Sequence, residues 1–301
     1  MSKTVLLSLA VMATVAGCAA KDTPASDSAK VAQSGKAAPV AAQASRGSFD
    51  PATHTATIYA KDYAFEAPDS ISAGLTTFHL VNEGPGLHHV QLVRLDSGKT
   101  IADLDAAMKN PGPPPAWAIF IGGPNAPDPS KTSDATFDIK EGNYALLCMV
   151  DIPDHIPHAA KGMARPFKVV AAAGTPAVAP TADVSISLAD YAFKVTGPLT
   201  AGKHTLKIEN AGPQPHEVEI LRLAPGKTMK DVDAWFESGQ KGPPPITPTP
   251  GMAGLGRGRT GTFTTTLTPG RYGVACFIPD VKDGKPHEMH GMVQEFTVAP
   301  K

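Results

Sequence analysis

The stretch YGVACFIPDVKDGKPHEMHGM, residues 272–292, decides how this chain is interpreted. Cys276 is one of only three cysteines in 301 residues, and His287 and the pair Gly291-Met292 follow it. A cysteine that only packs in a core and a cysteine that binds a metal are both compatible with this stretch alone. The rest of the sequence must distinguish between them.

A second copy of this stretch occurs upstream, at residues 144–163. It reads YALLCMVDIPDHIPHAAKGM and keeps the Tyr, the Cys, Pro-Asp, Pro-His and Gly-Met. DYAF also occurs twice, from Asp62 and from Asp190, and NEGPGLHHVQLVRL from Asn82 corresponds to NAGPQPHEVEILRL from Asn210. These matches predict a duplicated domain, with the first copy at residues 49–170 and the second at 183–301. Residues 171–182, AAAGTPAVAPTA, form the linker between them.

The N-terminus predicts a lipoprotein signal peptide over residues 1–18. Lys3 precedes a short apolar run, and the run ends in VAGC, which resembles a bacterial lipobox. The resemblance implies that Cys18 becomes the lipid-modified N-terminus, with residues 19–48 as a flexible tether. We therefore expect a bacterial cell-envelope protein that faces the periplasm. Ala19 after the cysteine resembles the pattern of Gram-negative lipoproteins that are sorted to the outer membrane.

The composition limits the possible partners. The net charge is −1 and only 18% of residues are charged, which argues against a nucleic-acid-binding surface. Beyond Cys18 no apolar run approaches the length of a transmembrane helix, so the lipid anchor is the expected membrane attachment.

The local pattern predicts an all-β fold. VSISLADYAF, from Val184, alternates apolar and polar residues, and TFTTTLTPGRYGVACFI contains a Pro-Gly turn between two strand patterns. One short helix per repeat is expected after Thr100 and after Thr228, because each threonine is followed three residues later by an aspartate. Short strands separated by turns favour one β-sandwich or barrel per repeat.

Few metal-binding side chains recur in both repeats. A thiolate with two imidazoles and a distant thioether is typical of an electron-transfer copper site, whereas zinc has little use for a thioether. An inert buried thiol and a disulfide between the two repeat cysteines remain as alternatives. The recurring residues are His88, Cys148, His158 and Met163 in the first repeat and His216, Cys276, His287 and Met292 in the second.

Three histidines without a counterpart in the other repeat lie near these residues. His155 is an alternative to His158 in the first repeat. His89 follows His88 in a strand pattern, so its side chain is expected to face solvent. His290 and the neighbouring Met289 are expected on the surface of a loop.

The motif Asn-x-Gly-x-x-x-His from Asn210, then TPGRYGVACF and HEMHGM, resembles the cupredoxin family of plastocyanin and azurin. The resemblance covers nearly all of each repeat and implies two tandem Greek-key β-sandwiches. It also implies up to two copper ions, each bound by the two histidines, the cysteine and the methionine of one repeat. The chain departs from the family in one respect, since nine residues separate Cys148 from His158 and ten separate Cys276 from His287.

The resemblance implies one-electron transfer through a copper site in each repeat. Copper storage or delivery in the cell envelope would use the same ligands. The expected partners are accordingly a redox protein or a copper donor or acceptor. An oxidase or reductase would need further copper-binding histidines, and no His-x-His motif occurs in the chain. An electron carrier or copper-binding protein is therefore favoured over an enzyme, and a copper oxidase or reductase and a metal-free scaffold stay as less favoured alternatives.

Overall fold

The computed structural model describes residues 46–96, 98–109, 114–125, 127–151 and 156–300. The predicted signal peptide, the lipidation site at Cys18 and His155 lie outside these ranges. Within them, no helix combines the length and the apolar character needed to cross a bilayer. The signal peptide, the lipid anchor and the domain boundaries stay predictions.

Among the described residues, the first repeat contains ten strands, one α-helix and one 3₁₀ turn, which lies between the last two strands. The helix is α1, Ile101–Met108, and the 3₁₀ turn is η1, His158–Lys161. The strands are β1 Ser48–Asp50, β2 Thr55–Lys61, β3 Ala64–Glu66, β4 Ser70–Ser72, β5 Gly74–Asn82, β6 Gln91–Leu95, β7 Ala118–Gly122, β8 Thr132–Ile139, β9 Gly142–Leu147 and β10 Ala164–Val170.

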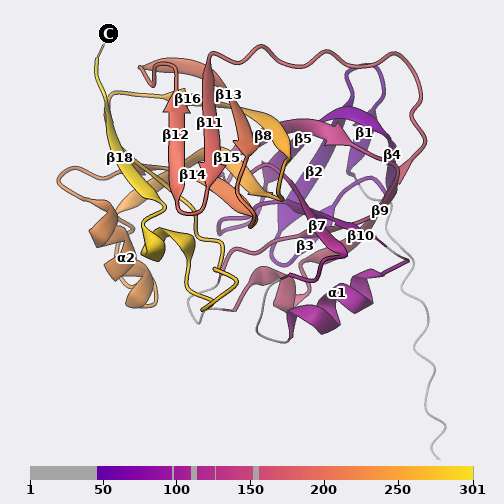
Figure 1. The fold of residues 1–301 in the computed structure, drawn as a ribbon, viewed down its shortest axis with the longest axis horizontal. Helices are drawn as coiled ribbons and strands as arrows, with labels where there is room; N and C mark the ends of the chain where they lie inside the picture. Colours follow the sequence, from indigo (N-terminus) through magenta and orange to yellow (C-terminus); the bar gives the residue numbers. More distant parts are fainter. Residues whose placement is uncertain (1–45, 97, 110–113, 126, 152–155, 301) are drawn as a thin grey trace, which may run out of the picture. The chain divides into compact units, whose positions relative to one another are not determined.

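The second repeat reproduces most of these elements. Its helix is α2, Met229–Glu237, and its 3₁₀ turn is η2, His287–His290. Figure 1 shows β11 and β12 side by side, as their antiparallel pairing requires. The strands are β11 Val184–Ala189, β12 Ala192–Thr196, β13 Gly202–Asn210, β14 His216–Leu223, β15 Ile246–Leu255, β16 Thr260–Leu267, β17 Gly270–Ala275 and β18 Val293–Val298.

The strands form two sheets, which confirms the predicted all-β sandwich fold class. One sheet runs in the order β1-β2-β5-β8-β16-β13-β11-β12, with β3 paired to β2. The other runs β18-β17-β14-β15-β7-β6-β9-β10-β4. The sequence pattern suggested two separate sandwiches, but both sheets continue from one repeat into the other, through the pairs β8–β16 and β7–β15.

Side chains from both sheets meet in one buried cluster, which includes Phe78 of β5 from one sheet and Leu146 of β9 from the other. Apolar and polar residues alternate along these strands, so one face of each strand points into the cluster. In β5, for example, every second residue from Thr76 to Asn82 is buried. Burial of this apolar surface is the main source of the fold's stability.

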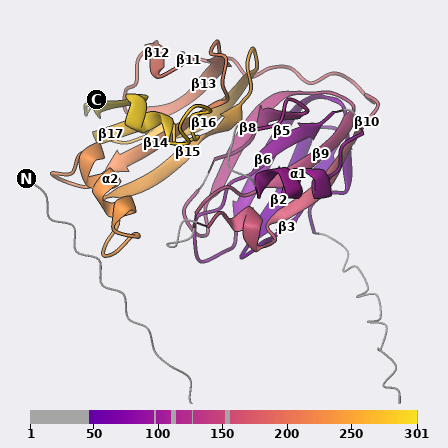
Figure 2. The same ribbon diagram turned by 60° about the horizontal axis from the view of Figure 1, so that its bottom comes forward.

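The two helices cover smaller apolar clusters, as expected for one helix per repeat. Leu104 of α1 packs against residues of β6, β7 and β9, and Figure 2 shows α1 beside β6 and β9. Val232 of α2 packs in the same way against β14, β15 and β17. Both helices begin with the capping box anticipated from Thr100 and Thr228.

Candidate metal centres

The four recurring residues of each repeat sit at corresponding places in the fold. His88 precedes β6, Cys148 follows the last residue of β9, and His158 begins η1. His216 is the first residue of β14, Cys276 follows β17, and His287 begins η2. Cysteine and histidine residues that are distant in sequence are thereby brought to one end of each sandwich.

In the first repeat the three side chains point their donor atoms at one another. Cys148 Sγ lies 3.4 Å from His158 Nδ1 and 4.0 Å from His88 Nδ1. The two Nδ1 atoms are 3.1 Å apart. In the second repeat Cys276, His287 and His216 show the same three distances, 3.4, 4.0 and 3.1 Å. The sequence therefore encodes the same triangle of donors twice.

The size of the triangle fits a metal ion. A point equidistant from the three atoms lies about 2.1 Å from each, close to metal–nitrogen and metal–sulfur bond lengths of about 2.0–2.3 Å. All three groups are buried in both repeats, and a thiolate with two imidazoles is the donor set that suits copper.

The long segment between Cys276 and His287 leaves the centre and returns to it. In the second repeat, the His287 amide donates to the Ile278 carbonyl and the Glu288 amide to the Cys276 carbonyl, at 3.0 and 2.9 Å. The bridge Pro279–Pro286 closes the loop at its base. The first repeat is closed by the bridge Asp151–Pro157. The excursion therefore leaves the donor triangle intact.

The methionine of each repeat is held next to the cysteine through the main chain. Gly162 has φ of 104°, a left-handed conformation that favours glycine, and it turns the chain so that the Met163 amide donates to the His158 carbonyl. The Cys148 amide in turn donates to the Met163 carbonyl at 3.1 Å. Met163 and Met292 are both fully buried, and their role as axial ligands stays a prediction.

The structure adds one residue per repeat that sequence reasoning missed. Asp62 Oδ1 lies 2.6 Å from His88 Nε2, and Asp190 Oδ1 lies 2.7 Å from His216 Nε2. A carboxylate that accepts from the outer nitrogen fixes the imidazole so that Nδ1 faces the metal position. The signal was the repeated DYAF, whose first residue is this aspartate.

The Asn-x-Gly motif provides the space for this contact. Asn82 accepts from the Gly84 amide and donates to the Gly86 carbonyl, which shapes the turn before His88. A Cβ atom on Gly84 would lie 2.3 Å from His88 Nε2, and one on Gly212 would lie 2.8 Å from His216 Nε2. Glycine is needed there because the imidazole and its aspartate occupy the space.

The electrostatic surroundings keep the histidines neutral and the thiols protonated when no metal is bound. Burial lowers the pKa of His88, although the hydrogen bond to Asp62 acts in the opposite direction. Burial and the neighbouring His216 lower the pKa of His287 to about 4. Burial raises the pKa of Cys148 to about 12 and that of Cys276 well above its usual value.

One alternative is excluded, and one expectation about a single residue is wrong. Cys148 and Cys276 are both free and buried, so they do not form the disulfide considered as an alternative. His89 does not face solvent: it is buried, accepts a hydrogen bond from the Met149 amide at 2.8 Å, and its Nδ1 lies 3.2 Å from Asn125 Oδ1. The local alternation failed at His89 because Asn125 and the main chain at Met149 cover its side chain.

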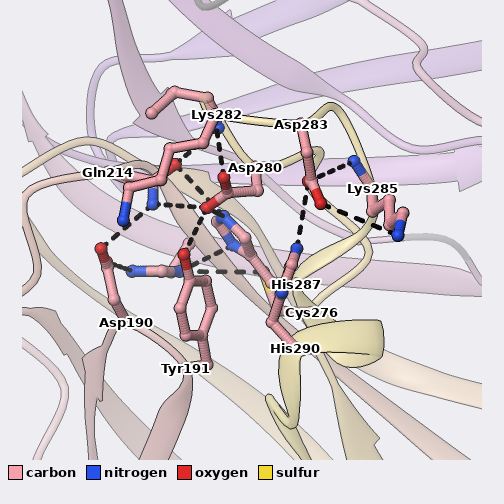
Figure 3. A network of polar contacts seen from close by, with 12 residues as sticks. Asp190, Tyr191, Gln214, Cys276, Asp280, Lys282, Asp283, Lys285, His287 and His290 are labelled. Carbon is pink, nitrogen blue, oxygen red and sulfur yellow. Dashed lines mark hydrogen bonds and ion pairs between the residues drawn. The ribbon is translucent and has the colours of Figure 1, made fainter.

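A polar network surrounds the second centre (Figure 3). Asp280 is buried, accepts from the Tyr191 hydroxyl at 2.6 Å and the Gln214 amide at 2.8 Å, and lies 3.7 Å from His287 Nε2. His290 Nε2 lies 3.1 Å from Asp283. Met289 is 59% exposed, as expected for a loop residue.

Each repeat thus carries a His, Cys, His triad at one end of a β-sandwich, with the cysteine at a strand end and the second histidine and the methionine on the next loop. The fold is cupredoxin-like. A comparison with protein-family models found no match, and a comparison with curated proteins found none.

A comparison with solved structures found matches that include two kinds of copper protein. An auracyanin from Roseiflexus castenholzii has 20% identity over 39% of this chain and 97% of its own, with a TM-score of 0.28. Auracyanin A from Chloroflexus aurantiacus has 22% identity over 38% of this chain and 98% of its own, with a TM-score of 0.27. A multicopper oxidase has 15% identity over 85% of this chain and 94% of its own, with a TM-score of 0.26. Because these TM-scores are low, we infer the function from the geometry of the two centres.

Proposed function

We propose that the chain is a copper protein that transfers single electrons through two centres, one in each repeat. The observation that carries this proposal is the duplicated donor triangle, with the same three distances in both repeats and with all donors buried. The ligand sets would be His88, Cys148, His158 and Met163 in the first repeat and His216, Cys276, His287 and Met292 in the second. Bound copper would supply a one-electron redox couple.

The protein's own contribution is a rigid and dry site. Asp62 and Asp190 orient one imidazole of each centre, and the closed loops fix the other. Each cysteine follows a strand that is paired on both sides, β9 in the first repeat and β17 in the second. Donors that cannot move keep the same geometry in both oxidation states, which favours rapid electron transfer.

An absorption spectrum tests this proposal. The Cu(II) form should show an intense thiolate-to-copper band and a reversible one-electron potential. A colourless protein that binds only Cu(I) would instead support copper storage or delivery, which uses the same donors.

The cellular setting is proposed on the sequence alone. The lipobox-like VAGC ending at Cys18 supports a lipid anchor in a bacterial envelope, facing the periplasm at the outer membrane. The partner would then be a redox protein of that compartment, or a copper donor or acceptor. If the anchor is present, detergent but not salt should release the chain from membranes. Cys18→Ala should abolish this membrane attachment.

A further inference from the structure

The donor triangles of the two centres have the same geometry, so we looked outside these triangles for groups that distinguish the centres. The distances within the donor triangles agree, and so do the aspartate contacts of the first histidine, at 2.6 and 2.7 Å. The repeat makes each centre an internal reference for the other. Residues that differ between the repeats at matching positions near the ligands therefore identify what distinguishes the centres.

One such difference is Gln214, which lies over His287 in the second centre (Figure 3). Its Nε2 donates to Asp190 at 3.0 Å and to Asp280 at 2.8 Å. Because a carboxylate can only accept, these two contacts fix which end of the amide group is nitrogen and which is oxygen. Its Oε1 accepts from the Val281 amide at 2.9 Å and lies 3.4 Å from His287 Nε2. The oxygen of a clamped amide thus faces the outer nitrogen of a proposed ligand.

The matching position in the first repeat is Gly86, which has no side chain to accept from His158. The backbone there has the same arrangement: Asn82 Nδ2 donates to the Gly86 carbonyl at 2.8 Å, and Asn210 Nδ2 donates to the Gln214 carbonyl at 2.7 Å. A Cβ atom added at Gly86 would meet no other atom within 4 Å. A side chain can therefore start at position 86 without a clash at its Cβ atom.

Two further positions differ in the same sense. The amide after Cys148 donates to the imidazole of His89, whereas the amide after Cys276 donates to the carboxyl of Glu217 at 2.8 Å. Gln91 of the first repeat corresponds to Glu219 of the second. In both positions the second repeat has a carboxyl side chain where the first repeat has an imidazole or an amide.

We propose that Gln214 makes the two copper centres unequal, so that the second centre has the lower reduction potential. This inference rests on the proposed function. An acceptor on the outer N–H of a ligating imidazole raises the electron density on the ligand and stabilises Cu(II) over Cu(I).

The test measures the potential of each centre separately by spectroelectrochemical titration. The full chain with Cys276→Ser reports the first centre, and the chain with Cys148→Ser reports the second. The second centre should have the lower potential, by about tenfold in the one-electron equilibrium constant or about 59 mV. Gln214→Gly should raise the second potential, and Gly86→Gln should lower the first. Gly86→Leu adds a side chain of similar size without a hydrogen-bond acceptor, and it should leave the potential of the first centre unchanged.

The outcomes separate this inference from the proposed function. The inference is overturned if the two potentials are equal, if the first centre has the lower potential, or if neither Gln214→Gly nor Gly86→Gln changes a potential. The proposed function would still hold in these cases, because two copper centres remain. Chains that bind no copper would overturn the proposed function and the inference with it. If Gly86→Gln does not fold, Gln214→Gly decides the question, because it reproduces a residue that the first repeat already accommodates.

Discussion

Asp190 Oδ1 lies 2.7 Å from His216 Nε2, on the side of the imidazole opposite the donor triangle. The contact connects the first motif of the second repeat, DYAF, to the proposed metal ligand near the start of β14. Because Asp62 makes the same contact with His88 at 2.6 Å, the chain contains two copies of a carboxylate–histidine pair. Several predictions about the metal centres depend on these pairs and on their surroundings.

Asp190→Asn should weaken copper binding at the second centre by about 10- to 100-fold, the usual cost of losing a hydrogen-bond partner of a metal-binding histidine. Competition titration with a chelator of known affinity measures the change. Asp62→Asn is the matched control and should affect the first centre alone. An Asp190→Asn chain that keeps full affinity at both centres would show that the carboxylate does not position the ligand.

Gly212→Ala should also reduce copper affinity at the second centre. The new methyl group would lie 2.8 Å from His216 Nε2 and 3.0 Å from Asp190 Oδ1, so one of the two must move. Gly86→Ala is the control, since its methyl group meets open space. Copper stoichiometry and the melting temperature distinguish a disturbed site from a disturbed fold. Undiminished affinity in Gly212→Ala would contradict the described packing.

Copper uptake at neutral pH should release about one proton per centre. The thiols hold their protons, because burial raises the pKa of Cys148 to about 12, while the pKa of His287, lowered to about 4, leaves that histidine neutral. Titration in weakly buffered solution with a pH indicator measures the release. Each Cys→Ser substitution should remove one proton from the total. Uptake with no proton release would mean that the thiols are not ligands.

The stability of the metal-free chain should fall as the pH rises from 5 to 9, in part because of Glu219. Burial, with a contribution from Glu217, raises the pKa of Glu219 from 4.5 to about 8. A carboxyl whose folded pKa is raised favours the folded state while it is protonated, and this contribution is lost between the two pKa values. Urea unfolding at pH 5 and pH 9 should show a smaller difference for Glu219→Gln, the residue type found at position 91. An unchanged difference would exclude Glu219 as the source.

Much of the fold follows from short-range patterns in the sequence. The alternation in the strands, the Thr100 and Thr228 caps and the repeat itself predicted an all-β chain with one helix per repeat. The pairing of β8 with β16 and of β7 with β15 could not be predicted, because the sequence shows which face of a strand is apolar but not which edge meets another strand.

The candidate donors could be found because the repeat preserves them, and side chains that recur in both copies point to a shared chemical role. Asp62 and Asp190 were missed because an aspartate at the end of a strand is also common in turns. His89 was wrongly expected in solvent for a related reason, since local alternation does not show that Asn125 lies against it.

Copper titration of the purified chain, followed by absorbance, tests the central claim most directly. The wild-type chain should bind two equivalents with a thiolate-to-copper band, Cys148→Ser and Cys276→Ser should each bind one, and the double variant should show no such band. Uptake of copper that is unchanged by either substitution would contradict the account.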